Sequence, residues 1–345
     1  MHRNWIRAAT AIGLIVAAPN ISAAQSGETE RPAYLELPAG VTEQRVTLGA
    51  GEWQVTAALT MPKGKGPFPA MVLVHGSGPG TLDMNVGGSV IYRDLAWGMA
   101  ARGVAVIRYT KRTTEHRAEF KALGRPPTLN EEFVEDASSA AALLKRTAGV
   151  DPKRIYIFGN SQGGMLAATI ANNNRLAGAL IMSSSPRPIG DILIQQANYV
   201  ASISTAPDTL KRAGEIRQNG ERLNALTPAS DANEVIHGSP VWYWRDMAAI
   251  DPIGQVRKLV AAGGRVAIMH GDRDYLITEE DWQAWRAVLS DTPGVTLKEY
   301  PRLNHIMQEG EGKMTPDEYK WTRPVSGELM DDLARWIEVG SARRR

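Results

Sequence analysis

The sequence predicts an α/β fold with a mostly parallel sheet of about eight strands, helices on both faces and a helical cap. Short, nearly continuous apolar runs alternate with stretches of helical periodicity, which is typical of parallel strands that are covered on both faces. One connection, from residue 185 to residue 264, is about 80 residues long, too long for an ordinary loop. These two observations carry the prediction.

The strands begin with a hairpin over Val41 to Pro62, where polar and apolar residues alternate on either side of a turn at Gly49 to Gly51. A last strand is expected at Val295 to Tyr300. Between them lie five apolar runs that are short enough to be buried strands: Ala70 to Gly76, Val104 to Tyr109, Arg154 to Gly159, Ala177 to Ser184 and Arg265 to Gly271.

The helices are expected wherever apolar residues recur with the helical period. The long connection has the same periodicity and few strand signals, which predicts a helical cap at about residues 186–249, placed over the site. The remaining predicted helices are Val90 to Arg102, Asn130 to Thr147, Gly163 to Asn174, Glu279 to Leu289 and Val325 to Val339.

Composition narrows the class of protein. A chain of 345 residues with 43% hydrophobic content can bury one large core, so we expect a single domain over residues 25–345 with the cap as its insertion. The 39 basic and 37 acidic residues are mixed along the chain, which argues against nucleic-acid binding. The absence of cysteine excludes a thiol nucleophile. No sequence signal indicates an oligomeric state.

Residues 1–24 have the features of a secretory signal peptide. Arg3 and Arg7 precede an apolar stretch from Ala8 to Ala18, and the small residues Ser22 and Ala24 come just before the expected cut. The stretch is shorter than the roughly 20 residues that cross a bilayer. We therefore expect export with cleavage, a periplasmic or secreted location and no stable membrane insertion of the mature chain.

The segment "GNSQGG" places Ser161 where a predicted strand meets a predicted helix. A tight turn at this junction would expose the hydroxyl above the carboxyl edge of the sheet, and Gly159, Gly163 and Gly164 would leave room for the turn and for close helix packing. The helix N-terminus that follows offers N–H groups to an oxyanion. Ser161 is therefore the candidate nucleophile.

A serine hydroxyl needs a base, and the base needs an orienting acid. His305 follows the predicted strand at Val295 and is the histidine that falls where the base is required. "HGDRDYLI" supplies two competing acids, of which Asp274 is favoured by its spacing from Gly271, whereas Asp272 lies nearer the strand end. We expect Asp272 to be solvated or paired with Arg273.

The glycine-rich "HGSGPG" after the first parallel strand is the expected source of a second oxyanion donor. The two candidate donors are the backbone N–H groups of Ser77 and Gln162. The alternative for this run is a plain turn.

Two further groups allow both a functional and a structural interpretation. Trp242, Tyr243 and Trp244 could line an acyl pocket or form part of the core between cap and sheet. The basic residues of "RYTKR", namely Arg108, Lys111 and Arg112, could bind an acidic group or form a salt-bridged loop.

We expect no metal and no cofactor. His270, Asp272 and Asp274 are close in sequence, but they belong to the strand end and the acid loop, and neither H-E-x-x-H nor a cysteine pair accompanies them.

The chain from Val41 to Val339 resembles bacterial α/β-hydrolases of the serine esterase type, a group that includes dienelactone-hydrolase-like and prolyl-oligopeptidase-like catalytic domains. The resemblance is carried by "VLVHGSGPG", "RDLAWGMAARGVAVIRYTKR", "VDPKRIYIFGNSQGG", "HGDRDYLI" and "LNHIM", and by the order Ser, Asp, His. Two features depart from the named subfamilies: dienelactone hydrolases use cysteine, which is absent, and the peptidases carry a propeller domain, for which there is no room.

The resemblance implies a carboxylester hydrolase that acts on small-to-medium acyl esters through an acyl-enzyme, with Ser161 as nucleophile, Asp274 as acid and His305 as base. The same triad serves peptidases, thioesterases and acyltransferases, which stay open as alternatives. A non-catalytic binding protein on the same fold is a further alternative from a different class.

Overall fold

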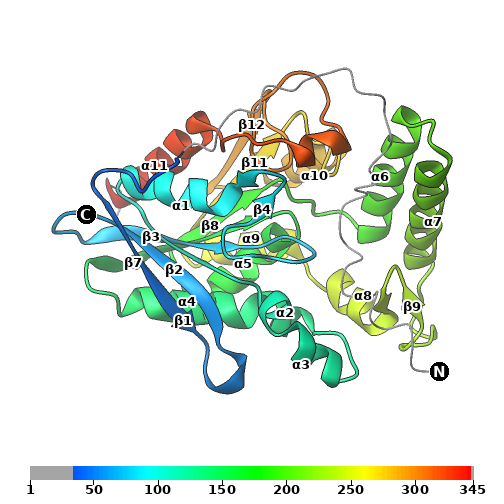
Figure 1. The fold of residues 1–345 in the computed structure, drawn as a ribbon, viewed down its shortest axis with the longest axis horizontal. Coiled ribbons are helices and arrows are strands. Elements are labelled where there is room, and N and C mark those ends of the chain that lie inside the picture. The colour runs from blue at the N-terminus through cyan, green and yellow to red at the C-terminus, as the bar shows by residue number, and fades with distance from the viewer. Residues whose placement is uncertain (1–33, 343–345) are drawn as a thin grey trace.

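The computed structural model describes residues 34–342, and its centre is an eight-stranded sheet (Figure 1). The strands run across the sheet in the order β1-β2-β6-β3-β7-β8-β11-β12. Their bounds are β1 (Val41–Leu48), β2 (Val55–Pro62), β3 (Phe68–Val74), β6 (Ala105–Tyr109), β7 (Val150–Asn160), β8 (Gly178–Met182), β11 (Arg265–Gly271) and β12 (Val295–Tyr300).

Most of the sheet is parallel, as predicted. The β1–β2 hairpin is antiparallel and joins β6 in antiparallel fashion, whereas every neighbouring pair from β6 to β12 is parallel. Parallel strands have their carboxyl ends at one edge, so the loops that leave β3, β7, β11 and β12 meet there. The predicted fold class is confirmed.

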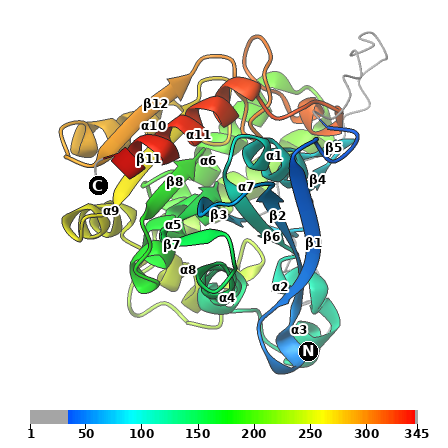
Figure 2. The ribbon, with the colours of Figure 1, turned by 90° about the vertical axis from the view of Figure 1, so that its left-hand side faces the viewer.

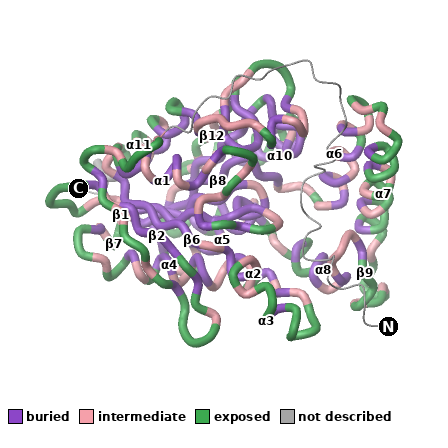
Figure 3. Tube along the Cα trace, in the orientation of Figure 1, coloured by how far each residue is buried: buried purple, intermediate pink, exposed green. Residues whose placement is uncertain are grey.

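Both faces of the sheet are buried, which explains the continuous apolar runs. In β3, for example, Ala70, Val72 and Val74 belong to one core cluster while Met71 and Leu73 belong to the other. Buried residues accordingly fill the centre of the molecule (Figure 3).

Helices cover each face. α1 (Ile91–Ala101) and α11 (Gly327–Ala342) pack against one cluster, and Figure 2 shows them on the same side of the sheet. The helices of the opposite face are α4 (Glu135–Lys145), α5 (Gln162–Asn173), α9 (Pro252–Ala261) and α10 (Glu279–Leu289). The predicted helix over residues 130–147 begins with a π-helical turn, Asn130–Val134. Two short helices, α2 (Arg112–Glu115) and α3 (Arg117–Ala122), precede it.

The long connection after β8 holds α6 (Ile189–Ile203), α7 (Pro207–Asn224) and α8 (Val241–Ala248). α6 and α7 pack side by side at one end of the molecule, the right-hand end in Figure 1. The connection also contains a two-residue ladder, β9 (Val235–Ile236) with β10 (Ser239–Pro240), that the sequence pattern did not indicate. A similar small ladder, β4 (Asn85–Val86) with β5 (Ser89–Val90), precedes α1.

The expected signal peptide, residues 1–24, lies outside the described residues. Over residues 34–342, no helix has the combination of length and apolar character needed to span a membrane.

Candidate active site

Ser161 sits at the turn between β7 and α5 with φ 56° and ψ −124°. A non-glycine residue with positive φ is uncommon and strained, and such strain is held only where the surroundings fix it. The glycines of "GNSQGG" provide that close packing, because a Cβ on Gly159 or on Gly163 would come within 2.3 Å of a backbone oxygen. A Cβ on Gly164 would lie 2.6 Å from the Cβ of Ser184.

Asp274 and His305 are joined directly. Asp274 lies in the loop between β11 and α10 and is 0% exposed, and His305 follows β12 and is also buried. Nδ1 of His305 donates to Oδ2 of Asp274 over 2.6 Å. The other carboxylate oxygen, Oδ1, accepts from the N–H groups of Leu276 at 2.8 Å and Ile277 at 3.1 Å. Both oxygens are therefore fixed, and the imidazole is left with Nε2 for other partners.

Asp272, the other candidate for the acid, is not the carboxylate that contacts His305. Asp272 is exposed, while Arg273 is buried and donates to Oε1 of Glu318 over 2.5 Å. Of the two alternatives expected for Asp272, the structure agrees with the solvated one, because the guanidinium of Arg273 turns inward to the carboxylate of Glu318.

A cavity of about 110 Å³ lies at the carboxyl edge, and Ser161, His305, Ser77 and Gln162 all line it. The cap contributes to the same wall through the first turns of α6, and the acid loop through the residues that follow Asp274. The large apolar lining residues from these elements and from α5 are Ile189, Ile192, Leu193, Leu276, Ile277 and Met165. The cavity thus combines a hydroxyl, an imidazole and a mainly aliphatic wall.

Comparison with known proteins identifies the family. Residues 71–319 match the family described as Alpha/beta hydrolase family. Esterase EstD of Thermotoga maritima is 33% identical over 310 residues, which are 90% of this chain and 70% of EstD. The chain belongs to the α/β-hydrolase family.

Solved structures agree on the fold of this hydrolase. Est1E of Butyrivibrio proteoclasticus is similar with a TM-score of 0.54 at 16% identity, and the match covers 86% of this chain and 99% of Est1E. A proposed dipeptidyl aminopeptidase IV of Bacteroides ovatus has a TM-score of 0.54 at 17% identity; 86% of this chain is covered, but only 36% of that longer protein. The predicted fold and enzyme class, a hydrolase, are confirmed by the family.

The aromatic residues of α8 do not line the hydrolase cavity. Trp244 is buried in the core and its indole Nε1 donates to the carbonyl of Ile236 at 2.8 Å. Tyr243 is also buried, and Trp242 packs against the same core cluster. Their placement follows the structural interpretation, because α8 returns the chain from the cap to the sheet.

Lys111 and Glu132 form a buried polar connection that sequence reasoning missed. Lys111 is 1% exposed, and its Nζ donates to the carbonyls of Gly76 at 2.9 Å and Gly78 at 3.2 Å and to Oε1 of Glu132 at 2.6 Å. Burial lowers the pKa of Lys111 and the charge of Glu132 raises it. The ammonium therefore supports the loop that contains Ser77.

The connection continues on the other side of Glu132. Tyr243 donates to Oε2 of Glu132 at 2.9 Å, and Nε2 of Gln162 donates to the Tyr243 hydroxyl at 3.1 Å. A chain of hydrogen bonds therefore links the two segments from which the oxyanion donors were expected. Glu132 lies in the π-helical turn, a feature frequent at functional sites but invisible to a helical periodicity.

The other basic residues of "RYTKR" are ion-paired. Arg108 contacts Glu43 at 2.7 Å and Asp83 at 3.0 Å, and Arg112 contacts Asp136 at 2.6 Å. The salt-bridged loop is the interpretation that the structure supports for this segment.

Proposed function

We propose that this hydrolase cleaves carboxylic esters through a covalent acyl-enzyme, with Ser161 as nucleophile, His305 as base and Asp274 as the acid that orients His305. The observation that carries the proposal is the 2.6 Å hydrogen bond between Nδ1 of His305 and a fully buried carboxylate, with Ser161 in the same cavity. An imidazole held in this way keeps its proton on Nδ1 and leaves Nε2 free to accept another.

In the acylation step, Oγ of Ser161 attacks the ester carbonyl carbon as its proton passes to Nε2 of His305. The carbonyl π bond opens and its electron pair goes to the oxygen. When the tetrahedral species collapses, the C–O bond to the alcohol breaks and His305 returns the proton to the leaving oxygen. Between these two proton transfers, Asp274 stabilises the imidazolium of His305 and keeps its own negative charge.

The oxyanion is stabilised by the backbone N–H groups of Ser77 and Gln162 in this proposal. Their position in the cavity wall supports this role, as does the N-terminus of α5, whose partial positive charge favours an anion beside Ser161. In the second half of the reaction a water gives its proton to His305 and attacks the acyl carbon, and Ser161 leaves with that proton as the carboxylic acid is released.

The substrate class follows from the cavity. A volume of about 110 Å³ with aliphatic walls suits a short acyl group, and the contribution of α6 limits its length. EstD is named an esterase, which supports an ester over other acyl substrates. We therefore propose small-to-medium esters with a preference for the shorter acyl chains.

A fluorophosphonate probe tests the mechanism, because it phosphonylates an activated serine. The intact mass of the folded protein should rise by one adduct, peptide mapping should locate it on Ser161, and Ser161→Ala should take none. Absence of an adduct on Ser161 in folded wild-type protein would overturn the mechanism.

A panel of nitrophenyl esters of increasing acyl length, acyl thioesters and aminoacyl amides then tests the substrate class. We expect the highest kcat/KM for short esters. Higher values for thioesters or amides would favour the thioesterase or peptidase alternative, and acyl transfer to an added alcohol in preference to water would favour an acyltransferase.

We also infer from residues 1–24 that the enzyme acts in the periplasm or outside the cell. Expression of the full chain in a bacterial host, followed by fractionation and N-terminal sequencing, should give a mature protein that begins at Gln25. Retention of an uncleaved chain in the cytoplasm would contradict export.

A further inference from the structure

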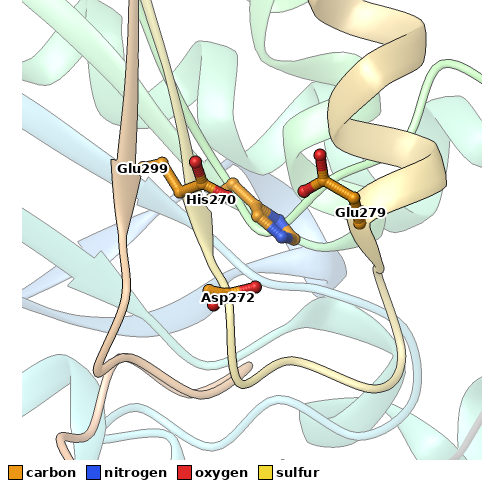
Figure 4. Close-up of side chains that lie close together, drawn as sticks. All are labelled: His270, Asp272, Glu279 and Glu299. Carbon is orange, nitrogen blue, oxygen red and sulfur yellow. The ribbon is translucent and has the colours of Figure 1, made fainter.

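Four potential metal ligands converge at the acid loop and the strands beside it. His270 is the penultimate residue of β11 and pairs in register with Glu299 on the neighbouring β12, so their side chains project from adjacent strands. Asp272 follows His270 by two residues, and Glu279 begins α10. Figure 4 shows these four side chains around one space. One imidazole nitrogen and three carboxylate oxygens lie within 4.8 Å of one another.

His270 is the buried member of the group. It is 2% exposed, and within residues 34–342 its Nε2 has no hydrogen-bond partner. Its ring stacks on Trp282 of α10 with centroids 5.7 Å apart and an angle of 13° between the planes. A buried polar nitrogen without a partner is costly and calls for an explanation. A bound cation would supply the missing partner.

The three carboxylates gather negative charge without a matching cation. No lysine or arginine of the described chain forms an ion pair with Asp272, Glu279 or Glu299. The nearest basic side chains are Lys313, which donates to the backbone carbonyl of Asp272 at 3.0 Å, and Arg286 of α10. The group therefore offers one imidazole nitrogen and three mutually repelling carboxylates to a cation.

We propose that His270, Asp272, Glu279 and Glu299 bind one Zn²⁺ ion. Zinc accepts imidazole nitrogen and carboxylate oxygen together and takes four ligands in a tetrahedron, which matches the number and kind of groups present. Bond lengths of about 2.1 Å require ligand atoms about 3.4 Å apart, and the exposed carboxylates can close from their present spacing by side-chain rotation. The sequence expectation of no metal relied on local motifs, whereas these ligands come from three separate elements.

The ion would stabilise the segment that holds the orienting acid. Asp274 lies between Asp272 and Glu279, so one cation would fasten both ends of the acid loop to each other and to β12. The expected role is structural, because the cluster is separate from the residues that line the catalytic cavity. Bound zinc should therefore raise the melting temperature.

The test uses the purified full-length or processed chain, stripped with EDTA and titrated with ZnCl₂ in calorimetry and in thermal unfolding. One ion should bind per chain, and Tm should rise by about 5 °C at a hundred times Kd. Glu279→Gln and Glu299→Gln each remove one ligand oxygen and its charge without altering the core, and each should weaken binding by more than about tenfold.

Glu280→Gln is the matched control. Glu280 is the next residue of α10, is exposed and contacts Arg187 instead, so zinc affinity should not change. The proposal is overturned if stripped protein binds no zinc, if the two ligand variants bind it as tightly as Glu280→Gln does, or if only Ca²⁺ and Mg²⁺ bind. Those two cations prefer oxygen ligands and would leave His270 unused.

Discussion

Replacement of Asp274 by asparagine should inactivate the enzyme while preserving its fold. In the structure the N–H groups of Leu276 and Ile277 donate to Oδ1 of Asp274. They require an acceptor, so the carbonyl oxygen of an asparagine would take this position and its NH₂ group would face Nδ1 of His305. A donor facing Nδ1 forces the imidazole proton onto Nε2, the nitrogen that should accept the proton of Ser161.

The size of the effect follows from this change of tautomer. The wrong tautomer and the lost carboxylate charge together lower kcat by about 10⁴-fold, which corresponds to about 5 kcal/mol in the activation barrier. Because Asp274 acts through His305 and lines no part of the substrate cavity, KM should change little. The two backbone hydrogen bonds remain, so the melting temperature should stay close to that of the wild type.

The assay measures kcat and KM on one activated short-chain ester for the wild type, Asp274→Asn and Asp272→Asn, after each protein has been checked for its melting temperature. EDTA in every sample removes any contribution of a bound cation. The reasoning is refuted if Asp274→Asn retains more than a tenth of the wild-type kcat, or if Asp272→Asn loses as much.

Three further changes test how the site is held. Lys111→Met should destabilise the protein by at most about 3 to 5 kcal/mol in urea unfolding, because it leaves the partly buried Glu132 without its cation, and should lower kcat by up to about 10²-fold; unchanged stability would contradict the role of the pair. Gly163→Ala should destabilise by about 3 kcal/mol or more, since its Cβ would meet a backbone oxygen at 2.3 Å, whereas Gly214→Ala, in open space on α7, should be neutral or gain up to about 1 kcal/mol in the same melts. Burial lowers the pKa of His75 from 6.5 to about 4, so the unfolded chain takes up the proton first as pH falls. The free energy of unfolding that comes from keeping His75 neutral is therefore complete above pH 6.5 and is lost toward pH 4. Urea titrations should show a loss of about 3 kcal/mol across that range, and the loss should shrink in His75→Gln if the assignment is correct.

The parts of the fold that sequence predicts are those encoded by local pattern. β11 and β12 have the predicted bounds, and α10 begins and ends where its periodicity predicts. Central strands such as β6 and β8 are buried along their whole length and can therefore be recognised as short apolar runs, and the turn at Ser161 is marked by adjacent glycines. Such signals depend on neighbours in sequence and need no knowledge of the tertiary structure.

Asp274 and His305 could be paired from sequence because the order of the motifs indicates their roles, but other partners that are distant in sequence carry no such signal. Glu132 lies in a π-helical turn and pairs with Lys111, 21 residues earlier in the chain, and no period in the sequence indicates that turn. Glu299 lies beside His270 through the register of two strands that are about 30 residues apart in sequence. Trp244 belongs to an aromatic run that the sequence does mark, but such a run can line a pocket or fill a core. Only the position of α8 in the fold decides between the two.

The two sites around β11 follow from the geometry of one strand and the loop after it. His270 and Asp272 are separated by one residue and belong to the cluster with Glu299, whereas Asp274, after the turn, contacts His305. The carboxylate of Asp274, which we propose orients the base, is fixed by its hydrogen bonds, and the same loop connects Asp272 to Glu279, two of the three carboxylates that repel one another in the cluster. Relief of that repulsion by a cation would stabilise the loop without touching the reacting atoms. Zinc should consequently raise the melting temperature and leave kcat unchanged, and a change of kcat with zinc that occurs in wild-type protein but not in Glu279→Gln would contradict this separation of roles.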